Sequence, residues 1–268
     1  MINFGETTAV PVSENFSYYF FHRKDIGLVI RGKITKKINS PELQSNWLEG
    51  KYTEQDFILN TRYFVRNAQL ALILTLSKDN RPFYVAAEKD FVIGVGGYRK
   101  SFLKKPSFYP FKNSKNKDGV LTKKDCKKVS IKYLTITDRD LSSITVAINR
   151  LLSAVCDRDN PDDVLIDAVM CWENIIGVNG ETTFRVCAAA ATLLSNNTND
   201  TKMLFKSMKT IYSDRSNLVH GSSSYTQNTE HINQAVYYAA KLTNVVIENE
   251  DLLYSTSEER NEKALHIQ

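Results

Sequence analysis

The sequence predicts an α+β chain, in which a strand-rich mixed N-terminal domain precedes an all-α helical bundle. Three observations support this prediction. Apolar residues before residue 133 often alternate as in strands, and residues after 136 show helical periods with recognisable caps. Charge is also divided unevenly between the two parts. We therefore expect domains over residues 1–132 and 133–268.

Strand character marks four segments of the N-terminal part. Residues 15–21, 26–34, 81–87 and 89–98 are rich in β-branched and aromatic side chains. The stretch from Thr53 to Leu76 differs, because its apolar residues recur every three to four positions without Gly or Pro. We expect this stretch to be a helix that leads into a strand.

Cap residues indicate five helices in the C-terminal part. We expect Thr137 to begin the first, over the apolar series to Val155, and Asn160 with Pro161 to begin the second, which Gly177 ends. The other three run from about 181 to 194, 201 to 221 and 229 to 246. The polar residues from 255 onward are expected to be frayed.

Composition excludes several classes of protein. The 268 residues are 42% hydrophobic and 24% charged, and no apolar run approaches the roughly 20 residues of a membrane helix. The first residues carry an acidic side chain where a signal peptide would be basic, and the four cysteines form no C-x-x-C pair. We expect a cytoplasmic protein with no membrane span and reduced cysteines.

Basic charge is concentrated before the predicted domain boundary. Residues 98–132 hold 12 Lys+Arg against 2 Asp+Glu, whereas residues 133–268 hold 11 against 18. Phe and Tyr alternate with the lysines, a mixture that can stack bases and neutralise phosphates. The alternative is a solvated loop whose aromatic residues pack on the strands beneath. The candidate contacts to RNA are Arg99, Lys100, Lys104, Lys105, Lys112, Lys123 and Lys124.

One predicted helix carries a charge where its apolar stripe should continue. Leu204, Met208 and Ile211 are spaced by four and three residues, and Arg215 occupies the next position. A guanidinium in a core or interface position needs a paired, hydrogen-bonded partner. A structural ion pair with Glu173 is one explanation.

Further polar residues lie at the end of the same helix. His220 follows Arg215 by five residues, a step that rotates by about 140° and rises about 7.5 Å. Asn217 and His220 are three residues apart and share a face. The helix end therefore carries a cation, an amide and an imidazole.

The segment from Tyr212 to Gly221 resembles the R-x4-6-H signature of the HEPN superfamily, in the Val-His-Gly form of its ApeA-like branch. The segments 168–174 and 180–185 fit the same branch in order and distance, so the resemblance covers about residues 137–250. Family members often have Asn, Asp or His directly after the Arg. This chain has Ser216 there and Asn217 one place later.

The resemblance implies a HEPN-type bundle that cleaves RNA, with tRNA among the candidate substrates, without a metal or cofactor, in a defence or toxin system. It also implies a homodimer with a composite cleft, and an inhibitor or activator partner is compatible with it. An imidazole can take the proton of a 2′-hydroxyl, and an arginine can hold phosphate oxygens. The expected catalytic set is Arg215 and His220 with Asn217, Ser216 and Glu173 in support.

Other interpretations of these residues stay open at this point. His220 could be only a helix C-terminal cap, which the helix dipole favours. His22, His231 and His266 have no Cys or carboxylate at ligand spacing, so we expect no metal site. The second function considered is a non-catalytic HEPN scaffold that binds RNA or a protein partner through the basic segment.

Overall fold

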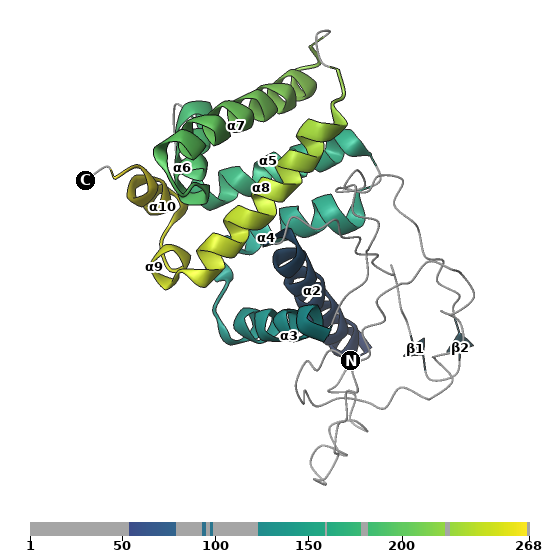
Figure 1. Cartoon of the computed structure of the whole chain (residues 1–268). Helices are drawn as coiled ribbons and strands as arrows, with labels where there is room; N and C mark the ends of the chain where they lie inside the picture. Colours follow the sequence, from purple (N-terminus) through teal and green to yellow (C-terminus); the bar gives the residue numbers. More distant parts are fainter. Residues whose placement is uncertain are drawn as a thin grey trace.

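A computed structural model describes residues 54–78, 93–94, 97–98, 123–158, 160–177, 182–222 and 226–266 (Figure 1). Nearly all of these residues are helical. The helices are α2 (Glu54–Lys78), α3 (Lys123–Asp138), α4 (Thr145–Leu152), α5 (Pro161–Ile176), α6 (Thr182–Leu194), α7 (Thr198–Val219), α8 (Thr229–Glu248), α9 (Glu250–Leu253) and α10 (Ser257–Leu265). A 3-10 turn, η2 (Ser142–Ile144), and a π turn, η3 (Ser153–Asp157), flank α4.

The α+β prediction is wrong, because the described residues form a helical bundle. Their only extended part is the antiparallel pair β1 (Ile93–Gly94) and β2 (Gly97–Tyr98). The strands expected over 15–21, 26–34 and 81–87 lie outside the described residues.

The helix expected to give way to a strand before Leu76 continues to Lys78 instead. Residues 67–77 of this helix, α2, are all buried. An apolar run of this kind fits a buried strand and a buried helix equally well, which explains the error.

The end of the basic segment is a helix rather than a loop. Asp125, Val129, Tyr133 and Ile136 form the buried stripe of α3, while Lys124, Lys127 and Lys128 are exposed. The many lysines around these positions obscured the helical period in the sequence. The domain boundary expected at residue 133 falls within α3.

Thr137 does not begin a helix. Its hydroxyl donates to the carbonyls of Tyr133 and Leu134, in the last turn of α3. The next turn begins at Asp140, whose carboxylate accepts the Ser142 N–H at 2.9 Å. This hydrogen bond lowers the pKa of Asp140. The apolar series that follows is divided between η2, α4 and η3.

The sequence predicts α5 to α8 well. The Asn160 side chain accepts the Asp162 N–H at 3.1 Å, and α5 ends immediately before Gly177, as expected. The bounds of α6 and α8 agree with the prediction to within two residues. Helix α7 begins three residues earlier, at Thr198, because Asn197 caps it.

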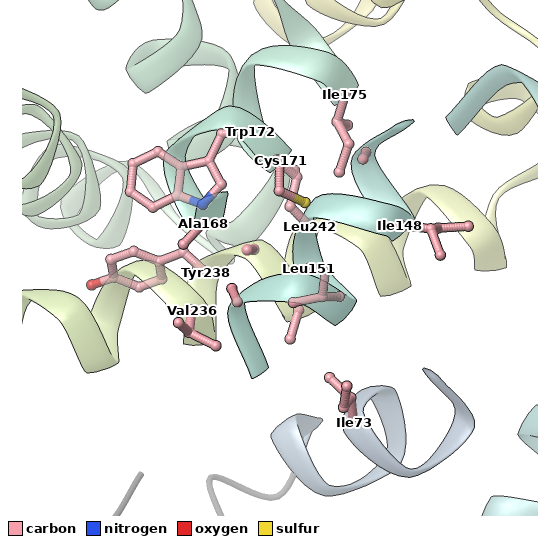
Figure 2. Packing of buried hydrophobic residues seen from close by; sticks show 14 of the residues in the cluster. Ile73, Ile148, Leu151, Ala168, Cys171, Trp172, Ile175, Val236, Tyr238 and Leu242 are labelled. Carbon is pink, nitrogen blue, oxygen red and sulfur yellow. The ribbon is translucent and has the colours of Figure 1, made fainter. Parts of the chain in front are cut away.

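The core is centred on the crossing of α5 and α8 (Figure 1). Trp172 is fully buried at this crossing, donates its indole N–H to the Ala235 carbonyl at 3.2 Å, and lies beside Tyr238 (Figure 2). The α6–α7 hairpin packs on one side, and α4 and α2 extend the core on the other. None of the described helices combines the length and apolar character that crossing a membrane requires.

The four cysteines are free, and three of them are buried. Burial raises the pKa of the Cys171 and Cys187 thiols to about 12, so both stay protonated near neutral pH. The prediction of cysteines packed as small apolar residues is confirmed for these positions and for Cys156.

The prediction of a frayed C-terminus is wrong. Thr256 and Glu259 form a capping box that begins α10, with the Thr256 N–H donating to the Glu259 carboxylate at 2.7 Å. Two residues of this helix, Arg260 and Asn261, are fully buried. Their polar groups therefore need partners from the rest of the bundle.

Backbone carbonyls at helix ends supply most of those partners. Arg260 donates to the carbonyls of Leu252, Leu253 and Ile175, and to the Ser143 hydroxyl. Carbonyls at a helix C-terminus carry the negative end of the helix dipole, so they stabilise the guanidinium. Its buried position still lowers the pKa of Arg260, by desolvation.

Replacing Arg260 with Met is expected to lower the free energy of unfolding by about 3–5 kcal/mol, because several desolvated oxygen atoms lose their donor. Urea denaturation followed by circular dichroism measures this loss. The control is Glu262→Ala on the exposed face of α10, for which a change within about 0.5 kcal/mol is expected. Equal stabilities of the two variants would contradict the role of Arg260.

Candidate active site

The C-terminus of α7 is closed by two backbone hydrogen bonds. The Ser222 N–H donates to the Asn217 carbonyl at 2.9 Å, and the Gly221 N–H donates to the Leu218 carbonyl at 3.2 Å. This pattern is a Schellman motif, and its left-handed position is Gly221, with a φ of 65°. His220 is the last residue before this glycine, so the motif fixes its backbone at the end of the helix.

Glu173 joins α5 to α7 through two side chains. Its Oε1 accepts the Tyr212 hydroxyl at 2.5 Å, and its Oε2 lies 3.3 Å from a terminal nitrogen of Arg215. The Arg215 guanidinium also lies 5.9 Å from the centre of the Tyr212 ring. We call Glu173, Tyr212 and Arg215 the α5–α7 cluster. The expected contact between Glu173 and Arg215 is present.

Tyr212 was missed in the sequence. It lies three residues before Arg215 on α7, so the two side chains share a face, and this spacing was the available signal. Burial, the hydrogen bond to Glu173 and the charge of Glu173 raise the pKa of Tyr212 well above its usual value near 10. Arg215 and a hydrogen bond with Thr183 oppose this shift.

Arg215 is only partly satisfied by the cluster. The side chains of Arg215 and Glu173 are 21% and 22% exposed, so solvent or a ligand reaches both. Arg215 Nε is buried and has no hydrogen-bond partner in the described part of the chain. The exposed part of the guanidinium is therefore at its terminal nitrogens, and these can donate hydrogen bonds to an anionic group.

The other expected catalytic residues lie in the last turn of α7. Ser216 and Asn217 are half-buried, and their carbonyls accept the N–H groups of His220 and Ser222. His220 is exposed beyond them and takes no part in the α5–α7 cluster. The structure therefore brings Glu173 and Arg215 together, and separates His220 from them by more than one helical turn.

A second histidine, His231, has no carboxylate at ligand spacing in the sequence but is paired with one in the structure. His231 Nδ1 in α8 lies 2.5 Å from the carboxylate of Asp214, the residue before Arg215. Asp214 lies on α7 and His231 on α8, so the pairing depends on how the two helices pack and is not visible as a spacing in the sequence. In the described residues no group of three or more His, Cys, Asp or Glu side chains could hold a metal ion.

Most of the expected RNA contacts lie outside the described residues: Arg99, Lys100, Lys104, Lys105 and Lys112. Lys123 begins α3, and Lys124 follows it with an exposed side chain. Lys127, which sequence reasoning did not single out, is exposed three residues further on. The α3 lysine pair, Lys124 and Lys127, thus lies on one helix face.

Comparison of the chain with protein-family models, with curated proteins and with solved structures gives no match. The HEPN resemblance therefore stays a prediction that rests on the motif residues.

Replacing Tyr212 with Phe is expected to destabilise the fold in a pH-dependent way. Because the folded state raises the pKa of Tyr212, the stabilisation from its proton is complete below about pH 10 and is lost as the pH rises further. Urea denaturation should give a constant difference between wild type and variant from about pH 7 to 9, and a smaller one above about pH 10.

The matched control is Tyr254→Phe, which removes an exposed hydroxyl. The difference in free energy of unfolding between this variant and wild type should stay constant over the same pH range. A Tyr212→Phe difference that stays constant at high pH would contradict the burial of this phenol against Glu173.

Proposed function

We propose that the chain is a metal-independent endoribonuclease of HEPN type, acting in the cytoplasm as a homodimer in a defence or toxin system. One observation carries this proposal. Arg215 is held by Glu173 and stays partly exposed, and His220 is exposed at a helix end that the Schellman motif orders. An anion-binding group and a proton acceptor thus follow each other at one end of α7.

Cleavage of RNA by its own 2′-hydroxyl uses these groups directly. His220 takes the 2′-hydroxyl proton, the 2′-oxygen attacks phosphorus, and the bond from phosphorus to the 5′-oxygen breaks. Arg215 binds the phosphate oxygens, where negative charge grows in the transition state. The products are a 2′,3′-cyclic phosphate and a 5′-hydroxyl.

Glu173 and Tyr212 have a positioning role in this mechanism. The carboxylate accepts from both side chains, so it fixes the direction from which Arg215 enters the site. Ser216 and Asn217, in the last turn of α7, are the remaining polar groups beside the reacting phosphate. A dimer would place a second copy of this arrangement opposite the first.

A non-catalytic scaffold is the alternative. The ion pair of Glu173 with Arg215 joins α5 to α7, and by itself this contact accounts for a charged residue on the apolar stripe. In that case the bundle binds RNA or a protein partner without cleaving it, and Arg215 matters only for the fold.

Arg215→Lys separates the two functions. Lysine keeps the positive charge beside Glu173 but cannot hold two phosphate oxygens as a guanidinium does. We expect Arg215→Lys and His220→Ala each to lower the rate of RNA cleavage in EDTA by about 10²–10⁴-fold, with little change in thermal unfolding. The substrates are labelled tRNA and a single-stranded RNA, and the product is assayed for a cyclic phosphate.

Wild-type cleavage with both variants inactive but folded supports the nuclease. No cleavage by wild type, together with unchanged stability and RNA binding in Arg215→Lys, would favour the scaffold.

The α3 lysine pair is the described part of the proposed RNA surface. Both side chains are exposed on one face, whereas residues 133–268 carry a net excess of acidic side chains. A basic helix beside an acidic bundle can draw RNA towards the chain and neutralise its phosphates.

Reversing both charges, in Lys124→Glu with Lys127→Glu, should weaken RNA binding by about tenfold or more. It should also reduce the slope of log K against log salt by about 0.7 for each lost phosphate contact. Fluorescence anisotropy over a salt series measures both quantities. The control is Lys202→Glu with Lys206→Glu on α7, two exposed positions with the same total change of charge. Equal effects of the two double variants would mean that α3 is no specific RNA surface.

A further inference from the structure

His231 lies at the same end of the α7–α8 hairpin as His220. It is the third residue of α8, and its N–H donates to the side chain of the cap residue Asn228 at 3.2 Å. In Figure 1 the end of α7 and the beginning of α8 lie at one end of the bundle. The cap and the contact with Asp214 together hold the imidazole at this end.

The pair of His231 with Asp214 is shielded but accessible. The distance from Nδ1 to Oδ2 is 2.5 Å, and the two side chains are 28% and 25% exposed. Asp214 directly precedes Arg215 on α7, so their side chains leave the helix about 100° apart. His231 is thus hydrogen-bonded to the turn of α7 that carries the proposed phosphate-binding arginine.

Along α8, the crossing with α5 follows His231 closely. Trp172, which precedes Glu173, donates to the carbonyl of Ala235, one helical turn after His231. Since Asp214 and Arg215 are neighbours in α7, the His231 pair and the α5–α7 cluster both involve the same turn of that helix.

We propose that His231, oriented by Asp214, is the general acid of RNA cleavage. This inference rests on the proposed function. Cleavage moves two protons, because a base removes the 2′-hydroxyl proton and an acid protonates the 5′-oxygen as its bond to phosphorus breaks. The R-x4-H segment supplies one imidazole, His220, and His231 supplies the second within the same chain.

The carboxylate of Asp214 determines which nitrogen of the ring reacts. With Nδ1–H donated to Asp214, Nε2 is the atom that exchanges a proton with the substrate. No described residue occupies Nε2. Asp214 is the positioning residue, and His231 is the group that touches the leaving oxygen.

A substrate with sulfur in place of the bridging 5′-oxygen tests this role, because a thiolate leaves without being protonated. We expect His231→Gln to lower the single-turnover rate by about 10²–10⁴-fold on the oxygen substrate and to act near the wild-type rate on the sulfur substrate. Glutamine can still donate to Asp214, so the contact between α7 and α8 is kept. His220→Gln should lose activity on both substrates.

The matched control is His266→Gln, which changes an exposed histidine beyond α10. It should leave both rates unchanged. If His231→Gln melts below the assay temperature, His231→Asn is measured with the same expectations.

Each other outcome overturns the inference in a recognisable way. If His231→Gln cleaves both substrates at the wild-type rate, the inference is overturned and the proposed function stands. The same conclusion follows if His231→Gln loses activity equally on both substrates. A wild type that cleaves neither substrate would overturn the proposed function together with the inference.

Discussion

The buried C-terminus of α5 is the constraint on which the rest of the site depends. The last carbonyls of any helix have no partner within it, and here they lie in the core, where leaving them unpaired is costly. Arg260 and Asn261 of α10 donate to the carbonyls of Ile175 and Ile176. Gly177 makes the exit possible, because a Cβ there would lie 2.2 Å from the Glu173 carbonyl oxygen. A short C-terminal helix thus fixes the end of α5.

Polar side chains connect this end of α5 to α7, and α7 to α8. Glu173, in the last turn of α5, receives Tyr212 and Arg215 of α7. The residue before Arg215, Asp214, then binds α8 through His231. A direct contact between α5 and α8 completes the set, because the Trp172 indole N–H of α5 donates to the Ala235 carbonyl of α8. The three helices are therefore held in register by directional contacts as well as by apolar packing, which has no preferred direction.

Local signals were predictable from the sequence, whereas contacts between distant residues were not. Asn160 and Pro161 predict the start of α5 because a cap acts on its own helix. Arg260 falls in the segment expected to be frayed, because its acceptor at Ile175 is 85 residues away in the sequence and no local signal points to it. At the site, the broken apolar stripe predicted a partner for Arg215, and Glu173 is in contact with it. The pairing of His231 with Asp214 depends on how α7 and α8 face each other, and no spacing within either helix indicates it.

Arg260 and Arg215 differ in how many of their hydrogen-bond donors the protein itself uses. Arg260 directs four of its five N–H groups to protein oxygens and is fully buried, so it has almost nothing left to offer a ligand. Within the described residues Arg215 makes one ion pair, at 3.3 Å, besides its contact with the Tyr212 ring, and its side chain remains partly exposed. Because a partly buried ion pair adds little net stability, stability alone is a weak reason for Arg215 to stand on the apolar stripe. Unlike Arg260, Arg215 keeps part of its guanidinium within reach of solvent, which is what binding an anion would require.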